Sequence, residues 1–382
     1  MKIGLVIDCL DPRRGGAERW TCRHAELLLA QGHEVHVVAR DVWPATERLG
    51  LVPHRLGAIA SIVGRAEAAE NVLRRLSLDV IHDFGLGWHG HLLLSHDGSR
   101  MAQWERKLQL LRPWMRPCKR AMIRVLPRYD EYRRLMARQF GDPDRTIIAI
   151  SKMCARDFQQ YHGVPAQRIR LIYHGIDTSR FSPEVRRHRR EAVRARLGLR
   201  DGETTFLFVG HDHRRKGLAT AVRAVERLAA EGRPVRLVVV GGRRRFPLPR
   251  PAERPQSVVT AVGPVDDPTP YYAAADALVL PSFYDPFGLV VLEAAACGLP
   301  VVTTRTTGAS ELLSHGADGY VVDDPRDESQ FAVHLRELTD PAVRRRMGEA
   351  ARATALCHDA SRSFAAMVEL YEAVADRQRC AA

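Results

Sequence analysis

The sequence lacks most features that mark secreted, membrane-spanning or zinc-binding proteins. Its seven cysteines are scattered without a C-x-x-C pair, which argues against a disulfide framework or a zinc site and fits a reducing compartment. No apolar run approaches the ~20 residues of a membrane span. The first residues, MKIGLVIDCL, are interrupted by Asp8 too early for a signal peptide. We therefore expect a cytoplasmic protein.

Acidic residues are scarce relative to basic ones. The chain has 45 Asp and Glu against 58 Lys and Arg, which gives a formal net charge of +13. Such an excess is typical of proteins that meet nucleic acid, an anionic membrane surface or an anionic substrate. With 382 residues, 45% of them hydrophobic, the chain is long enough for two domains with sizeable cores.

The most informative stretch is LVLPSFYDPFGLVVLEAAACGLPVV, residues 278–302. The apolar run 277–280 predicts a buried strand, and a short turn to Pro286 follows it. From Phe287 apolar residues recur at three- and four-residue intervals, which predicts a helix that Gly298 stops. A second apolar strand comes next, so the turn lies where open parallel sheets bind ligands.

Two carboxylates mark this unit: Asp285 before the predicted helix and Glu293 in its second turn, with seven residues between them. The first amides of the helix, those of Phe287, Gly288 and Leu289, have no intrahelical partner and carry the positive end of the helix dipole. Sugar hydroxyls can donate to the carboxylates while a phosphate accepts from the amides, and a nucleotide sugar offers both groups. The competing interpretation is an ordinary helix cap at Asp285 and a solvated Glu293. We favour the first, because a buried apolar helix seldom carries such a glutamate without a partner.

The stretch resembles the E-x7-E signature of retaining GT-B glycosyltransferases of family 4, usually met as E-P-F-G-L-V-x-L-E-A-x-A-x-G-x-P-V. The match is nearly complete, and the one departure is Asp285 where the family has Glu, a carboxylate one methylene shorter. The resemblance implies an α/β protein with two doubly wound Rossmann-like domains that face each other across a cleft. Residues 1–175 would form the acceptor-side domain, with 360–382 packing back on it, and 176–359 the nucleotide-sugar-binding domain. Glu293 would hold the ribose hydroxyls and Asp285 the transferred sugar.

The N-terminus predicts a βαβ unit that opens an α/β sheet: a strand over 2–8, a helix to about Gln31 and a strand over 35–39. Gly15 and Gly16 lie in the loop after the first strand, where glycines let a backbone approach a ligand closely. The pair does not form G-x-G-x-x-G, and a plain turn is an equally good interpretation. In the resembling family this loop lies near the donor phosphate and the acceptor.

A polar cluster follows the predicted strand over 92–95, beginning with His96 and Asp97. Side chains just beyond the carboxyl end of a strand are typical of binding sites. In related transferases a histidine after this strand reaches the sugar and phosphate of the donor, and His96 is the residue that fits. Asp97 is a second candidate. A capping or core-edge histidine is the alternative.

The second domain is predicted to open with a strand over 205–209, followed by a loop and a helix. The family pattern here is V-G-R-x-x-x-x-K-G, and Lys216 matches its lysine, which grips the donor diphosphate. A cation at a helix N-terminus is unfavourable for the helix itself, so an anionic ligand gives it a reason to be there. His211 stands where the family has arginine, and Arg214 or Arg215 would supply a second cation. A solvated surface is the competing interpretation for Lys216 and Arg215.

Residues 103–138 mix many arginines and lysines with Trp104, Trp114 and aliphatic side chains. Three prolines should break the stretch into short helical pieces. Basic side chains interleaved with aromatics can lie on an anionic bilayer, where each charge is worth roughly 1 kcal/mol. In this part the chain resembles the lipopolysaccharide-core glucosyltransferases of family 4. A solvated or interdomain face is the alternative, and nucleic acid is the least favoured partner.

Two other basic segments are expected to be solvated. The run 186–200 predicts an exposed helix ahead of the second domain. The insert 243–256 has the sequence RRRFPLPRPAERPQ. It predicts an exposed loop because it is rich in proline and arginine.

The resemblance implies transfer of a hexose from a nucleoside diphosphate sugar, with a UDP-sugar favoured, to a glycan or lipid-linked acceptor with retention of configuration. Enzymes of this family need no metal or other cofactor, and the chain has no D-x-D pair placed to hold a metal ion. We expect work on cell-envelope glycan such as the lipopolysaccharide core, at the inner face of the membrane, and no nucleic acid partner. A catalytically idle nucleotide-sugar-binding relative and a nucleotide-sugar epimerase of similar fold remain as alternatives.

Overall fold

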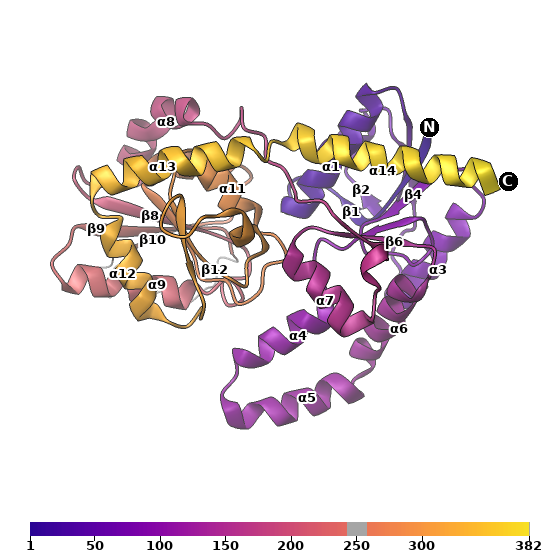
Figure 1. Cartoon of the computed structure of the whole chain (residues 1–382), viewed down its shortest axis with the longest axis horizontal. Coiled ribbons are helices and arrows are strands. Elements are labelled where there is room, and N and C mark those ends of the chain that lie inside the picture. The colour runs from indigo at the N-terminus through magenta and orange to yellow at the C-terminus, as the bar shows by residue number, and fades with distance from the viewer. Residues whose placement is uncertain (243–257, 382) are drawn as a thin grey trace. The chain divides into compact units, whose positions relative to one another are not determined.

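The structure is a computed structural model that describes residues 1–242 and 258–381 (Figure 1). The predicted loop over 243–256 lies outside the described residues. The chain divides into two compact units. Unit 1 comprises residues 1–173 and 361–382, and unit 2 comprises residues 174–360. Each is described by itself below.

Unit 1 is built on a seven-stranded parallel sheet with the order β3-β2-β1-β4-β5-β6-β7. The central strands are continuous apolar runs, as expected for strands covered on both faces. The strands are β1 (Lys2–Leu10), β2 (Glu34–Val42), β3 (Val52–Arg55), β4 (Val80–Asp83), β5 (Leu92–Leu94), β6 (Thr146–Ala149) and β7 (Ile169–Leu171).

The helices of unit 1 connect these strands and begin at recognisable caps. Ser61, Ser99 and Ser151 each accept a hydrogen bond from the amide three residues on, which satisfies one of the free donors of the first turn. The helices are α1 (Gly16–Ala30), α2 (Pro44–Glu47), α3 (Ile62–Leu73), α4 (Arg100–Gln109), α5 (Arg116–Val125), α6 (Pro127–Gly141), α7 (Lys152–His162) and α14 (Ala360–Ala381), with short 3-10 turns η1 (Pro113–Met115) and η2 (Ala166–Arg168).

The last helix, α14, packs on unit 1 through a buried polar contact. The Tyr371 hydroxyl lies 2.7 Å from His24 Nε2 and 2.5 Å from His82 Nδ1. Phe364 on the same helix stacks on His24, with ring centroids 5.3 Å apart. Burial lowers the pKa of His24 to about 3 and holds the pKa of His82 well below its usual range, so both rings are neutral at pH 7.

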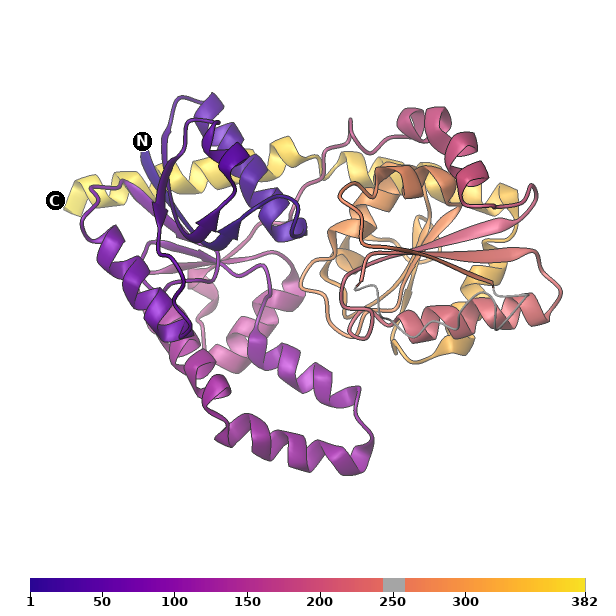
Figure 2. The ribbon, with the colours of Figure 1, turned by 180° about the vertical axis from the view of Figure 1, so that it is seen from behind.

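The basic segment 103–138 forms separate helices, as its prolines predicted. Only two of the three prolines interrupt the helical path. The helical path is interrupted near Pro113 and Pro127, whereas Pro117 lies in the first turn of α5, where proline is tolerated. Figures 1 and 2 show α5 standing away from the sheet of unit 1, between α4 and α6. No residue of α5 is buried, and the neighbouring Trp114 is 72% exposed.

Unit 2 is built on a six-stranded parallel sheet with the order β10-β9-β8-β11-β12-β13. Its strands are β8 (Thr204–Val209), β9 (Val235–Val240), β10 (Val259–Gly263), β11 (Ala277–Leu280), β12 (Val301–Thr304) and β13 (Gly319–Val322). Its helices are α8 (Pro183–Arg196), α9 (Leu218–Ala230), α10 (Thr269–Ala274), α11 (Leu289–Ala296), α12 (Glu328–Glu337) and α13 (Pro341–Leu356), with the 3-10 turn η4 (Gly308–Leu312).

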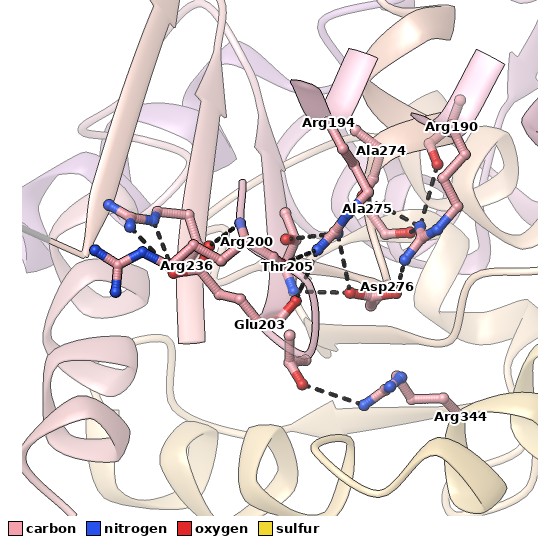
Figure 3. Close-up of polar contacts among 12 residues, drawn as sticks. Arg190, Arg194, Arg200, Glu203, Thr205, Arg236, Ala274, Ala275, Asp276 and Arg344 are labelled. Atoms are coloured by element: carbon pink, nitrogen blue, oxygen red, sulfur yellow. Dashed lines mark hydrogen bonds and ion pairs between the residues drawn. The ribbon is translucent and has the colours of Figure 1, made fainter. Parts of the chain in front are cut away.

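One face of α8 is not solvated, so the prediction for the run 186–200 is wrong there. Arg190 Nη1 donates to the three carbonyls of residues 273–275, at 3.2, 3.2 and 2.8 Å, and its Nη2 donates to Asp276 at 2.6 Å (Figure 3). Arg194 donates to the carbonyl of Ala274 and Arg186 to that of Ala275. Helix-end carbonyls carry partial negative charge, which the guanidinium groups stabilise. We call Arg186, Arg190 and Arg194 the arginine clamp.

No helix within residues 1–242 and 258–381 has both the length and the apolar composition needed to cross a bilayer.

Candidate active site

In unit 2, the loop that follows β8 is held against the end of the neighbouring strand β11. Gly217 ends this loop with φ at +75°, and a Cβ atom there would lie 2.0 Å from the carbonyl oxygen of Pro281. Only glycine allows that close approach with that backbone conformation. The contact brings Lys216, the residue before Gly217, to the turn between β11 and α11.

Lys216 meets Asp285 in this turn. Lys216 Nζ lies 2.5 Å from Asp285 Oδ2, and the two side chains are only 12% and 10% exposed. Burial by itself would raise the pKa of Asp285, but the charges of Lys216 and Arg215 and the hydrogen bonds it accepts outweigh burial and lower it. Arg215 is fixed nearby, because its Nη1 donates to the carbonyl of Tyr284 at 2.7 Å. A carboxylate and two cations therefore gather at the end of β11.

The amides predicted to be free at the start of α11 are partly engaged, and this corrects the prediction. The helix begins at Leu289, whereas we expected it to begin at Phe287. Gly288, the residue before Leu289, is the N-cap and has a left-handed backbone conformation. The Phe287 amide donates to the Asp285 carboxylate. A Cβ on Gly288 would lie 2.7 Å from a methyl group of Thr307, so the turn is closely packed. The N-terminus of α11 is thus already facing a negative charge.

Glu293 is buried, which excludes the solvated interpretation. It is 6% exposed, and its Oε2 accepts a hydrogen bond from the Tyr272 hydroxyl at 2.5 Å. Tyr272 is fully buried on α10 and was not among the predicted site residues. The signal that could have found it is the glutamate itself, because an acidic side chain in an apolar helix needs a donor close by.

In unit 1, Gly15 and Gly16 form the start of α1. Gly15 is the extended N-cap and Gly16 the first helical residue. A Cβ on Gly15 would lie 2.9 Å from Oε2 of Glu18, so the carboxylate of Glu18 folds back over the helix N-terminus. Burial raises the pKa of Glu18.

His96 lies two residues beyond the end of β5, in contact with α1. Its Nε2 is 3.2 Å from the Thr21 hydroxyl, and its ring stacks on Phe84 with centroids 5.4 Å apart. Burial lowers the pKa of His96 to about 4, so the ring is neutral at pH 7. Asp97, the second candidate, is exposed and pairs with Arg100 at 2.7 Å.

His96 and the start of α1 line one cavity of about 280 Å³ in unit 1. Its charged lining is largely paired: Arg65 Nη1 lies 2.5 Å from Asp8, and Arg100 pairs with Asp97. The wall also includes parts of α6, so the predicted membrane-facing segment contributes to a pocket as well as to the surface. The polar and aromatic side chains of the lining include Asp8, Glu18, Arg65, His96, Arg100 and Tyr132.

The structure thus brings together Lys216, Arg215 and Asp285 in unit 2. In unit 1 His96 lines the same cavity as Ala17 and Glu18, whereas Gly15 and Gly16 are not among its lining residues. His211 is exposed on the loop after β8. Among the described residues there is no group of three or more His, Cys, Asp and Glu side chains that could hold a metal ion. The roles of these residues in binding and catalysis stay predictions.

Comparison with known proteins agrees with this architecture. The family model "Glycosyltransferase Family 4" matches residues 14–180, and the model "Glycosyl transferases group 1" matches residues 189–354. A D-inositol 3-phosphate glycosyltransferase of Pseudarthrobacter chlorophenolicus is 34% identical over 241 residues, which is 60% of this chain and 56% of the relative. The chain therefore spans little more than half the length of the curated relatives it matches.

Solved structures share the fold over nearly the whole chain. The lipopolysaccharide-biosynthesis glycosyltransferase WaaG superposes with a TM-score of 0.77 at 23% identity and 98% coverage of both chains. Anabaena Alr3699/HepE, solved in complex with UDP-glucose, gives a TM-score of 0.72 at 18% identity, with 98% of this chain and 100% of that chain covered. The predicted GT-B fold, with one parallel sheet in each unit, is confirmed. Residues 14–180 therefore belong to the Glycosyltransferase Family 4 domains and residues 189–354 to the Glycosyl transferases group 1 domains.

Proposed function

We propose that this chain transfers a hexose from a nucleoside diphosphate sugar, a UDP-sugar, to a glycan or glycolipid acceptor with retention of configuration. The observation that carries the proposal is the Lys216–Asp285 pair in the turn between β11 and α11, the helix that bears the buried Glu293. The curated relatives are glycosyltransferases, and HepE was solved with UDP-glucose, which supports a donor of this class.

The proposed chemistry is electrostatic. As the bond between the sugar and the diphosphate breaks, negative charge builds on the leaving phosphate, and Lys216 with Arg215 would stabilise it in a site with little water. Without a donor, the Lys216 ammonium is hydrogen-bonded to the Asp285 carboxylate. An entering diphosphate would accept some of the hydrogen bonds that this ammonium donates. Asp285 is then available to accept a hydrogen bond from the transferred sugar, and Glu293 from the ribose. The nucleotide sugar acts as co-substrate, and we propose no metal or other cofactor, as in the family.

We infer that the acceptor meets the cavity of unit 1. Carboxylates at Asp8 and Glu18 can accept from sugar hydroxyls, and the neutral ring of His96 can donate or accept. The guanidinium of Arg65 is already paired with the carboxylate of Asp8. These features support an acceptor rich in hydroxyl groups, and the likeness to WaaG supports a cell-envelope glycan such as the lipopolysaccharide core.

We also infer that the protein works at the cytoplasmic face of the membrane, held by α5 and its flanks. This segment exposes Trp114 at 72% and Val125 at 78% among arginine and lysine side chains. A short helix with apolar residues beside many cations suits the surface of an anionic bilayer. Its separation from the sheet of unit 1 leaves it open to such a surface (Figure 2).

A catalytically idle nucleotide-sugar-binding protein is the second candidate. It is favoured by His211 in place of the usual arginine and by Asp285 in place of the usual glutamate. Such a protein would bind the donor without breaking its glycosidic bond.

Turnover of labelled UDP-, GDP- and ADP-sugars, with membrane glycolipid extract as acceptor, tests the proposal. We expect acceptor-dependent release of the nucleoside diphosphate, a product with the anomeric configuration of the donor, and loss of at least 100-fold in rate on Lys216→Ala. An epimerase would convert the donor without acceptor. Donor binding without any release of nucleotide would refute transfer and favour the idle candidate.

A further inference from the structure

The hydrogen bond between Tyr272 and Glu293 is short and buried, so it can hold the Glu293 carboxylate in place. The two oxygens are 2.5 Å apart, Tyr272 is fully buried and Glu293 is 6% exposed. A hydroxyl that donates to a carboxylate at this distance forms a charge-assisted bond, which is about twice as strong as a neutral one. It also restricts the rotation of the carboxylate, because one of its two equivalent oxygens must stay in reach of the phenol.

The phenol is itself fixed by contacts at both ends of α10. At the start of the helix, Asp267 accepts hydrogen bonds from the amide and hydroxyl of Thr269, at 3.1 and 2.7 Å. At its end, the arginine clamp holds the last carbonyls, with Arg190 binding three of them and Asp276 (Figure 3). A helix of six residues has little stability alone. The position of the Tyr272 ring therefore depends on these contacts.

We propose that Tyr272 is a positioning residue for the nucleotide: its hydroxyl holds the Glu293 carboxylate in the orientation that accepts from the ribose hydroxyls, and the arginine clamp sets the place of the phenol. The inference rests on the proposed function, since it assumes that Glu293 meets a nucleotide sugar. A carboxylate offers about four lone-pair positions, so it can accept from a tyrosine and from ribose hydroxyls at the same time.

The test compares binding of UDP with binding of 2′-deoxy-UDP by isothermal titration, on the full chain. If wild-type protein prefers GDP or ADP, that nucleotide and its 2′-deoxy form are used. In Tyr272→Phe we expect UDP binding to weaken about tenfold, and the preference for UDP over the deoxy form to fall at least about fivefold. The ratio of the two dissociation constants is measured on one protein sample, so a partly unfolded variant does not distort it.

Tyr271→Phe is the matched control, because Tyr271 lies on the same helix, with Arg196 5.8 Å from its ring, and is 9% exposed. Both dissociation constants should stay within about twofold of wild type. Equal weakening of UDP and 2′-deoxy-UDP in Tyr272→Phe, or no weakening of either, would overturn the inference. Wild-type protein that binds no nucleoside diphosphate would refute the proposed function and the inference together.

A second pair of variants tests the clamp from a distance. Arg190→Gln removes the contacts to the end of α10, and we expect it to lower the preference for UDP over 2′-deoxy-UDP about threefold. Arg187→Gln changes a neighbouring arginine of α8 that is 73% exposed, and should leave the preference unchanged. An unchanged preference in Arg190→Gln would refute the part assigned to the clamp.

Discussion

Breaking the Lys216–Asp285 pair from one side should destabilise unit 2 more than removing both partners. Lys216→Met leaves the Asp285 carboxylate in a site where the side chain is 10% exposed, and removal of one partner of a buried pair costs ~3–5 kcal/mol. Arg215 and the Phe287 amide still stabilise the carboxylate, so we expect the lower end, about 3 kcal/mol. Adding Asp285→Asn should restore about 2 kcal/mol of the lost unfolding free energy.

Urea unfolding at pH 7, followed by far-UV circular dichroism, measures these changes. With a slope near ~2 kcal/mol/M, a loss of 3 kcal/mol moves the midpoint of the affected transition by about 1.5 M. All five tryptophans, at positions 20, 43, 88, 104 and 114, belong to unit 1, so their fluorescence follows that unit separately. Arg305→Met, which breaks an exposed pair with Asp323, is the control and should cost under ~1 kcal/mol. Additive effects of the two single changes would refute the coupling.

Three further outcomes follow from the structure. Burial depresses the pKa values of four histidines of unit 1, His24, His82, His96 and His162, so the unfolded chain binds protons that the folded chain does not once the pH falls below ~6.5. The free energy of unfolding, followed by tryptophan fluorescence, should therefore be constant above that pH and fall by about 5 kcal/mol between pH 7.5 and 5.5; a flat profile would contradict the buried neutral rings. Trp114→Ser should weaken binding to phosphatidylglycerol vesicles about tenfold and leave donor binding unchanged, and equal vesicle binding would argue against the membrane role of this segment. Gly217→Ala should lower nucleotide affinity at least about tenfold, since the added methyl group strains the left-handed backbone and overlaps a carbonyl oxygen; unchanged affinity would mean that the loop can shift without consequence.

Much of the fold follows from local patterns in the chain. Alternating apolar strands and helices with clear stops predict two parallel sheets, and the observed strands β8 and β11 lie within a residue of the expected ones. The short edge strand β3 was not predicted, because its four residues, VPHR, are half polar and carry a proline. The length and place of α11 were predicted except for its first turn, where Gly288 adopts a left-handed conformation.

The contacts that support the site were harder to predict because they join distant parts of the chain. Tyr272 is 21 residues from Glu293, and no local pattern pairs them. The arginines on α8 are partly buried because they donate to carbonyls at the end of α10, which lies 80 or more residues away in the sequence. Tyr371 and His24 are separated by 347 residues. Local sequence patterns indicate which side chains are candidates for the site. The burial of those side chains and their hydrogen-bond partners depend on tertiary packing.

We propose that unit 2 holds a nucleotide by its diphosphate, through Lys216. Dissociation constants of UDP and UMP, measured for wild-type protein and for Lys216→Ala, test this role. We expect wild-type protein to bind the diphosphate at least about 30-fold more tightly than the monophosphate, and Lys216→Ala to reduce this preference to about threefold or less. A preference that is absent in wild type, or that survives the loss of Lys216, would show that Lys216 does not hold the diphosphate.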